Sequence, residues 1–171
     1  MAVELMAALA RIPERHATFH EQKTLAALAE PLLSSGTLNF RRPDHLEKIT
    51  LTPIHEILVV DAGRLTVTQD NHPSRVLDLG SHPEIRALVE AILGTLRGDL
   101  PALTRSYTVR LSGSMARWEL TLAPADARLA RLVRSITIDG AATELRSIRT
   151  QQANGDESRM TITPQPASAT P

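Results

Sequence analysis

The sequence contains no cysteine, which excludes disulfide bonds and thiolate metal sites. Aromatic residues are scarce, with two phenylalanines, one tryptophan and one tyrosine among 171 residues. A surface that stacks nucleic-acid bases needs aromatic side chains, so no such surface is expected. The apolar interior must therefore consist of Leu, Ile, Val, Ala and Met.

An excess of charge of either sign is also absent, because 19 Lys and Arg balance 19 Asp and Glu. Nucleic-acid-binding domains carry a basic face, so we expect no nucleic-acid partner. No apolar run approaches the ~20 residues that span a bilayer. The first 13 residues also lack the basic and long apolar regions of a signal peptide. Either the protein is cytoplasmic, or a signal peptide has been removed.

Patterns typical of catalysis or metal binding are missing. The six histidines form no HExxH motif, and the four-residue spacing of His16 and His20 separates them by ~13 Å on a strand. No serine lies in a GxSxG context, and the eight glycines are scattered at turns. We therefore expect no metal ion, no cofactor, no catalytic residue and no enzymatic activity.

Two segments show the periodicity of amphipathic helices. Residues 3–12 place apolar side chains three and four apart and stop at Pro13. Residues 82–97 repeat the pattern, with Ser81 as the expected cap and Pro83 in the first turn. A third, short helical turn is expected at 126–132.

Eleven short segments instead alternate between apolar and polar residues, which is typical of strands. They span residues 16–25, 36–41, 45–51, 55–60, 64–69, 75–79, 106–113, 116–124, 132–140, 143–151 and 158–164. Short turns between them favour antiparallel neighbours and one large sheet with one apolar face. We predict an α+β, mainly β fold of about eleven strands. Three helical pieces either cap the apolar face or leave a cavity beneath them.

One strand ends unusually. In the segment 36–41, Leu38, Phe40 and the following Arg42 point to the same side, whereas Arg41 points to the other, and Pro43 ends the pairing. Arg42 is then either a solvated charge at a flared strand end or an arginine at the rim of an apolar cavity. In the second interpretation its guanidinium donates hydrogen bonds to exposed helix-end carbonyls.

The segment HATFHEQK (16–23), with ELMAALARI before it and GTLNFRRP after it, resembles the LolA-type periplasmic lipoprotein carriers. The resemblance covers residues 3–164. It implies a curved, incomplete antiparallel barrel whose concave apolar face is capped by helices. It also implies one lipid-carrier domain over residues 1–164, a disordered tail over 165–171, and a periplasmic location after removal of a signal peptide.

The resemblance assigns roles to individual residues. Arg42 falls on the arginine that latches the lid, and Leu5, Leu9 and Ile12 fall on the N-terminal lid helix. The expected ligand-binding cavity is completed by Phe19, Leu38, Phe40, Leu88, Ile92, Leu96, Trp118 and Leu120.

The function that this resemblance implies is a carrier that binds lipid or acylated cargo in a lidded apolar cavity. The carrier shuttles its cargo from the inner to the outer membrane, as a monomer, between an inner-membrane exporter and an outer-membrane acceptor. Asp44, His45, Glu47 and Lys48 stand where these carriers usually have aromatics, which favours a related lipid or pigment over lipoprotein acyl chains. The alternative is a module on the same scaffold that senses a lipid or a partner without transporting it.

Overall fold

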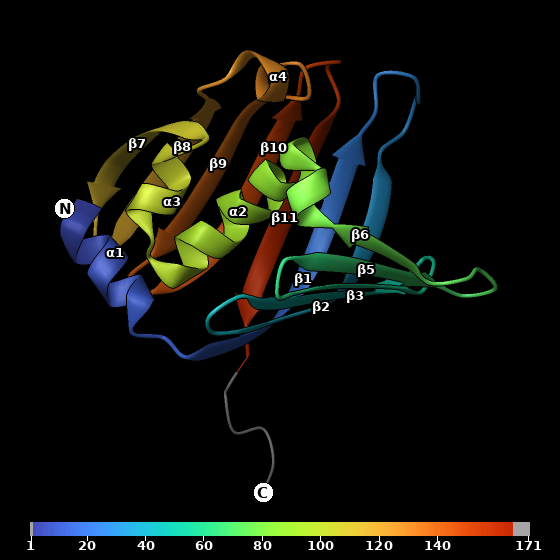
Figure 1. Ribbon diagram of the computed structural model, residues 1–171, viewed down its shortest axis with the longest axis horizontal. Helices are drawn as coiled ribbons and strands as arrows, with labels where there is room; N and C mark the ends of the chain where they lie inside the picture. Colours follow the sequence, from blue (N-terminus) through green and yellow to red (C-terminus); the bar gives the residue numbers. More distant parts are fainter. Residues whose placement is uncertain (1, 166–171) are drawn as a thin grey trace, which may run out of the picture.

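A computed structural model describes residues 2–165, in which eleven strands form a single curved sheet (Figure 1). The strand order is β6-β5-β4-β3-β2-β1-β11-β10-β9-β8-β7, and each neighbouring pair is antiparallel. The strands are β1 (Glu14–Thr24), β2 (Leu32–Arg41), β3 (His45–Thr52), β4 (Glu56–Asp61), β5 (Arg64–Gln69), β6 (Arg75–Asp78), β7 (Tyr107–Ser114), β8 (Arg117–Pro124), β9 (Val133–Ala141), β10 (Glu144–Gln152) and β11 (Glu157–Pro164). The sheet is open, with β6 and β7 as its edges, and the predicted fold class is confirmed.

Alternating side chains produce the two faces of this sheet. In β8, Trp118, Leu120 and Leu122 are buried on the concave face, whereas Arg117 and Glu119 are exposed on the other. A strand that is wet on one face and buried on the other must follow the period-two pattern seen in the sequence. Each of the eleven predicted segments accordingly overlaps one of the strands, although β2 begins four residues before its predicted segment.

The helices are α1 (Ala2–Ala10), α2 (Pro83–Arg97), α3 (Leu100–Thr104) and α4 (Ala127–Ala130), together with the 3-10 helix η1 (Leu79–Ser81). In Figure 1, α2 and α3 lie over one face of the sheet. Ser81 does not cap α2 as predicted, because it ends η1, and His82 is the cap residue. The α3 helix was not predicted, since it has only five residues, although Asp99 caps it by accepting from the Ala102 N–H at 3.1 Å.

Helices α1 and α2 contact each other closely at the end of α2. Gly98 caps α2 in the left-handed conformation, with φ of 66°. A Cβ at this position would lie 2.0 Å from the Met6 carbonyl oxygen in α1. Only glycine permits both the backbone conformation and this approach. The end of α2 therefore determines where α1 can lie.

The core is packed most fully over β7, β8 and β9, and it extends to Phe19, Phe40 and Val60 on the other strands. The helices α1, α2 and α3 cover β7, β8 and β9, and Leu5, Leu9 and Leu103 are fully buried there. The Tyr107 hydroxyl donates to the Ala87 carbonyl of α2 at 2.7 Å, which ties the middle of α2 to β7. Burial raises the pKa of this phenol well above its usual value, so it stays a neutral donor.

The C-terminal end of the described chain lies beside β1. Gln165 donates its backbone N–H to the His16 carbonyl at 2.8 Å. Of the tail predicted to be disordered, residues 166–171 lie outside the described residues.

Candidate functional site

A cavity of about 570 Å³ lies between α2 and the concave face of the other half of the sheet. Its walls come from α2 and from β1, β2, β3, β4, β5, β10 and β11. Most of the lining side chains are aliphatic, including Leu46, Leu58, Leu65, Ile148 and Ile162. The cavity is thus apolar and large enough for a small ligand.

The cavity exists because α2 presents apolar residues to both halves of the sheet. Ala87 and Ala91 are buried on the side of α2 that faces the filled part of the core. Leu88, Ile92 and Leu96 lie four residues apart, on one side of α2, and line the cavity. Leu88 and Ile92 are only partly buried, since empty space rather than a facing side chain lies next to them. The side chains that line such a void lack the van der Waals contacts that a filled core would provide.

Five residues predicted from the sequence line this cavity together. Leu38 and Phe40 reach it from β2, and Leu88, Ile92 and Leu96 reach it from α2. The structure thereby brings together residues that are about 50 positions apart in the chain.

The other predicted cavity residues do not line it. Leu5, Leu9, Phe19, Trp118 and Leu120 are buried in the core, and Ile12 is partly buried after the end of α1. Trp118 is anchored by a hydrogen bond from its Nε1 to the Ala142 carbonyl at 3.0 Å. Phe19 lies under the Lys48 ammonium, which is 5.2 Å from its ring centre. Helices α1, α2 and α3 and neighbouring strands cover Leu5, Leu9, Trp118 and Leu120, whereas the Lys48 side chain covers Phe19.

Arg42 lies at the junction of the lid and the sheet. Its Nη2 donates to the carbonyl oxygen of Arg97, the last residue of α2, at 3.4 Å. Its backbone N–H donates to the Pro13 carbonyl, just after α1, at 2.9 Å. The guanidinium bond is long and therefore weak, although a cation at a helix C-terminus is favourable. Arg41 on the opposite face is exposed.

Sequence reasoning missed Arg15, which lines the cavity from β1. Its Nε and Nη2 are buried and have no hydrogen-bond partner within residues 2–165. Burial lowers the pKa of this guanidinium, and the Glu144 carboxylate raises it in part. Arginine nevertheless stays charged in proteins. The only indication in the sequence was that Arg15 lies an even number of residues before Ala17 and Phe19, and alternate residues of a strand point to the same face of the sheet.

Glu21 and Lys48 form an ion pair at the cavity wall, with Lys48 Nζ 3.2 Å from Glu21 Oε1. Ser158 donates to the other carboxylate oxygen at 2.7 Å. Burial raises the pKa of Glu21, but Lys48, Ser158 and Lys23 together outweigh burial and hold the pKa below its usual value. Both charges are therefore satisfied within the protein.

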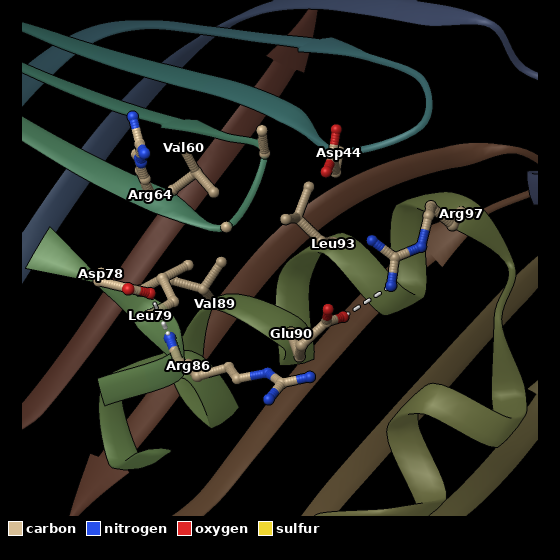
Figure 2. A pocket seen from close by; sticks show the side chains of 13 residues that line it. Asp44, Val60, Arg64, Asp78, Leu79, Arg86, Val89, Glu90, Leu93 and Arg97 are labelled. Atoms are coloured by element: carbon tan, nitrogen blue, oxygen red, sulfur yellow. Dashed lines mark hydrogen bonds and ion pairs between the residues drawn. The ribbon is translucent and has the colours of Figure 1, made fainter. Parts of the chain in front are cut away.

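A second hollow of about 470 Å³ lies on the other side of Val60 and Val89, which line both cavities. Figure 2 shows that Asp44, Arg64, Asp78 and Arg86 surround it. Arg97 is paired with Glu90 at 2.7 Å. Acidic and basic side chains are mixed here, so this hollow has no preference for one sign of charge.

Within residues 2–165 no three side chains are arranged to hold a metal ion. None of the described helices has the length and apolar character required to cross a membrane. The cavity under α2 is thus a candidate binding site built mainly from aliphatic side chains.

A family model described as "Outer membrane lipoprotein carrier protein LolA-like" matches residues 2–170. The chain belongs to the LolA-like family. This description names a family of carriers and not of enzymes. A search of curated proteins finds no match to this LolA-like chain.

Solved structures of low sequence identity are also similar to this chain. A LolA superfamily protein from Nitrosomonas europaea has 10% identity and a TM-score of 0.49, with 95% of this chain and 90% of that chain covered. MucB in the Pseudomonas aeruginosa MucA/MucB complex has 15% identity and a TM-score of 0.48, with 98% and 58% covered. A further structure of MucB has 16% identity and a TM-score of 0.48, with 99% and 58% covered. The chain thus spans a little over half of the MucB chains that it matches.

Proposed function

We propose that this LolA-like protein is a periplasmic carrier that binds lipid or acylated cargo in the cavity under α2 and moves it from the inner to the outer membrane. The observation that carries the proposal is the aliphatic cavity of about 570 Å³ beneath a helix that a single weak side-chain hydrogen bond holds at its end. Membership of a family of lipoprotein carriers supports the same function.

The magnitudes suit binding followed by release. Each buried methylene contributes ~0.8 kcal/mol, so a sixteen-carbon chain supplies roughly 12 kcal/mol before costs. Ordering the chain and opening the lid offset much of this gain. The bond from Arg42 to the Arg97 carbonyl is weak enough to break when cargo enters. When it reforms in the empty protein, it favours release.

The partners of this carrier are an inner-membrane exporter that loads the cavity and an outer-membrane acceptor that empties it. A carrier has to hand its cargo on at each side, so both transfers need a lid that opens. The protein acts as a monomer, because one chain contains the whole cavity among its described residues.

The test is a transfer assay. Donor vesicles carry a self-quenched fluorescent fatty-acid analogue, and unlabelled acceptor vesicles report its arrival. The protein should bind the analogue saturably and speed its transfer in proportion to protein concentration. Saturable binding without faster transfer would identify a sensing module on this scaffold. Failure of the folded protein to bind the analogue would exclude the cavity as a lipid site.

A further inference from the structure

One charged side chain in the cavity wall has buried donors without a hydrogen-bond partner, although the Glu144 carboxylate offsets part of its charge. Five ionisable side chains line it: Glu14, Arg15, His16, Glu21 and Lys48. Lys48 lies 3.2 Å from Glu21, and His16 lies 3.7 Å from Glu14. Arg15 has no ion pair among the described residues, and its Nε and Nη2 are buried without a partner.

The position of Arg15 in the sheet places it on the face that borders the apolar space, and its buried Nε and Nη2 become available to a ligand when the guanidinium turns towards the cavity. Arg15 is directly opposite Phe40 in the pairing of β1 with β2, and opposed residues share a face of the sheet. Phe40 lines the cavity from the concave face, so Arg15 does too. Arg15 thus lies at the end of the cavity where β2 runs into the latch residue Arg42.

The N–H groups of the two nitrogen atoms without a partner also have a defined arrangement. Nε and Nη2 lie on one edge of the planar guanidinium, so their N–H groups form a fork. Such a fork matches the two oxygens of a carboxylate or a phosphate. The donor pair at the other end of the cavity is already used, because Lys48 and Ser158 donate to Glu21.

We infer that the cavity selects a single-chain lipid with an anionic head group, a carboxylate or a phosphate, which Arg15 binds through Nε and Nη2. This inference rests on the proposed function, since it names the class of lipid carried. The acyl chain extends from Arg15 along the aliphatic wall towards Glu21 and Lys48. Six residues of β1 separate Arg15 from Glu21, which is roughly 20 Å of strand. A fully esterified or amidated acyl group has no anion for this fork.

The experiment compares ligands that differ only in the head group. Palmitic acid, hexadecyl phosphate and methyl palmitate each displace a fluorescent fatty-acid analogue from the protein at mildly alkaline pH. The two anions should bind roughly ten- to a hundredfold more tightly than the ester, as expected for hydrogen bonds to a charged group. Acetate and inorganic phosphate should compete weakly, because they have no chain. Tight binding of either would place a free anion in the site and overturn the inference.

Variants of Arg15 separate this role from a structural one. Arg15→Met should remove the preference for the anions and leave methyl palmitate binding unchanged, while Arg15→Lys keeps part of it. Arg15→Met should also raise the melting temperature of the empty protein, because it removes buried donors that have no partner. Arg41→Met, at an exposed arginine on the neighbouring strand, is the matched control and should change neither property.

The outcomes separate the two proposals. If the acids and the ester bind equally well to the parent protein, water molecules satisfy the guanidinium donors. The proposed anion site is then wrong, but the proposed lipid-binding cavity is not contradicted. If Arg15→Met lowers the melting temperature and leaves the head-group preference intact, Arg15 is structural and the inference fails. If no lipid binds to the folded parent, the proposed function itself is wrong.

Discussion

At the scale of the residue, two arginines have different environments: Arg15 lines the cavity, whereas Arg42 is not among its lining residues and lies at the end of α2. Arg42 makes one long hydrogen bond to the end of α2, while its Nη1 stays buried without a partner within residues 2–165. Arg15 makes no side-chain hydrogen bond there. Each unsatisfied buried donor costs about 1–3 kcal/mol. Such costs in the empty protein are typical of a site whose donors gain hydrogen-bond partners in a second state, such as the cargo-bound state.

Arg42→Leu should slow the release of a bound acyl probe. The substitution removes the hydrogen bond to the Arg97 carbonyl and adds apolar surface at the rim, so the closed empty state competes less well with cargo. A bond of this kind contributes about 1 kcal/mol, so the off-rate to acceptor vesicles should fall severalfold. Arg41→Leu is the control on the opposite face. Equal off-rates in the parent and both variants would show that Arg42 is not a latch.

Glu21→Gln should destabilise the protein at neutral pH and have no effect in acid. The pKa of Glu21 is lowered from 4.5 in the folded protein, so its carboxylate adds stability above pH 4.5 that disappears as pH falls through the folded pKa. The loss at neutral pH should be about 1–3 kcal/mol, because Lys48 is left without its partner. Urea unfolding across this pH range measures it. Glu119→Gln, on the exposed face of β8, should show no such dependence.

At the scale of the element, helix α2 takes part both in the empty state and in the proposed cargo-bound state. One side of α2 packs on the filled core through Ala87 and Ala91, and another side covers the cavity through Leu88, Ile92 and Leu96. Tyr107 holds the middle of the helix by a hydrogen bond to Ala87. The end near Gly98 contacts α1 and α3 and accepts the long Arg42 hydrogen bond. If Arg42 is the latch, opening starts at this C-terminal end of α2.

Ile92→Asp should weaken binding of the acyl probe by roughly tenfold or more and leave the sheet folded. A carboxylate at this place on α2 meets the aliphatic ligand and has to be desolvated when the ligand enters. The measurement is a probe titration together with circular dichroism, which reports the sheet. Glu90→Gln, elsewhere on α2, provides a charge-changing control. Unchanged affinity in a folded Ile92→Asp protein would place the ligand elsewhere.

At the scale of the whole molecule, one half of the sheet is a packed core and the other half borders the cavity. Leu120, Leu122 and Ile138 in the packed half are fully buried. A tightly packed half is rigid, and a half with a void can adapt its shape to a ligand. The helices that are proposed to move therefore lie next to the cavity, and the strands far from the cavity stay in place.

Hydrogen exchange should show this division directly. Adding palmitic acid should speed amide exchange in α1 and in the last turn of α2, because the lid is displaced, and should leave β7, β8 and β9 unchanged. The increase should be absent in the Arg42→Leu protein, whose lid end is already freed. Uniformly slower exchange across α1 and α2 would mean that ligand enters without opening the lid.

The eleven strands, the antiparallel order and the two main helices were predictable from the sequence, because period-two and period-3.6 patterns are local properties of the chain. The placement of Leu38 and Phe40 on the same face as Arg42 followed from the same alternation. The short α3 helix and the cap of α2 were not predicted, because a few residues carry too weak a local signal. These elements depend on what they contact.

The cavity itself was decided by tertiary structure. Leu5, Leu9, Phe19, Trp118 and Leu120 have the same apolar pattern as Leu38 and Ile92, and a sequence pattern cannot tell a filled interior from an empty one. The difference arises because α1 and α3 help to cover β7, β8 and β9, whereas only α2 spans the strands that border the cavity, where Lys48 covers Phe19. Arg15 became a candidate in the same way, since the role of a charge on an apolar face depends on which hydrogen bonds and ion pairs it makes in the folded chain.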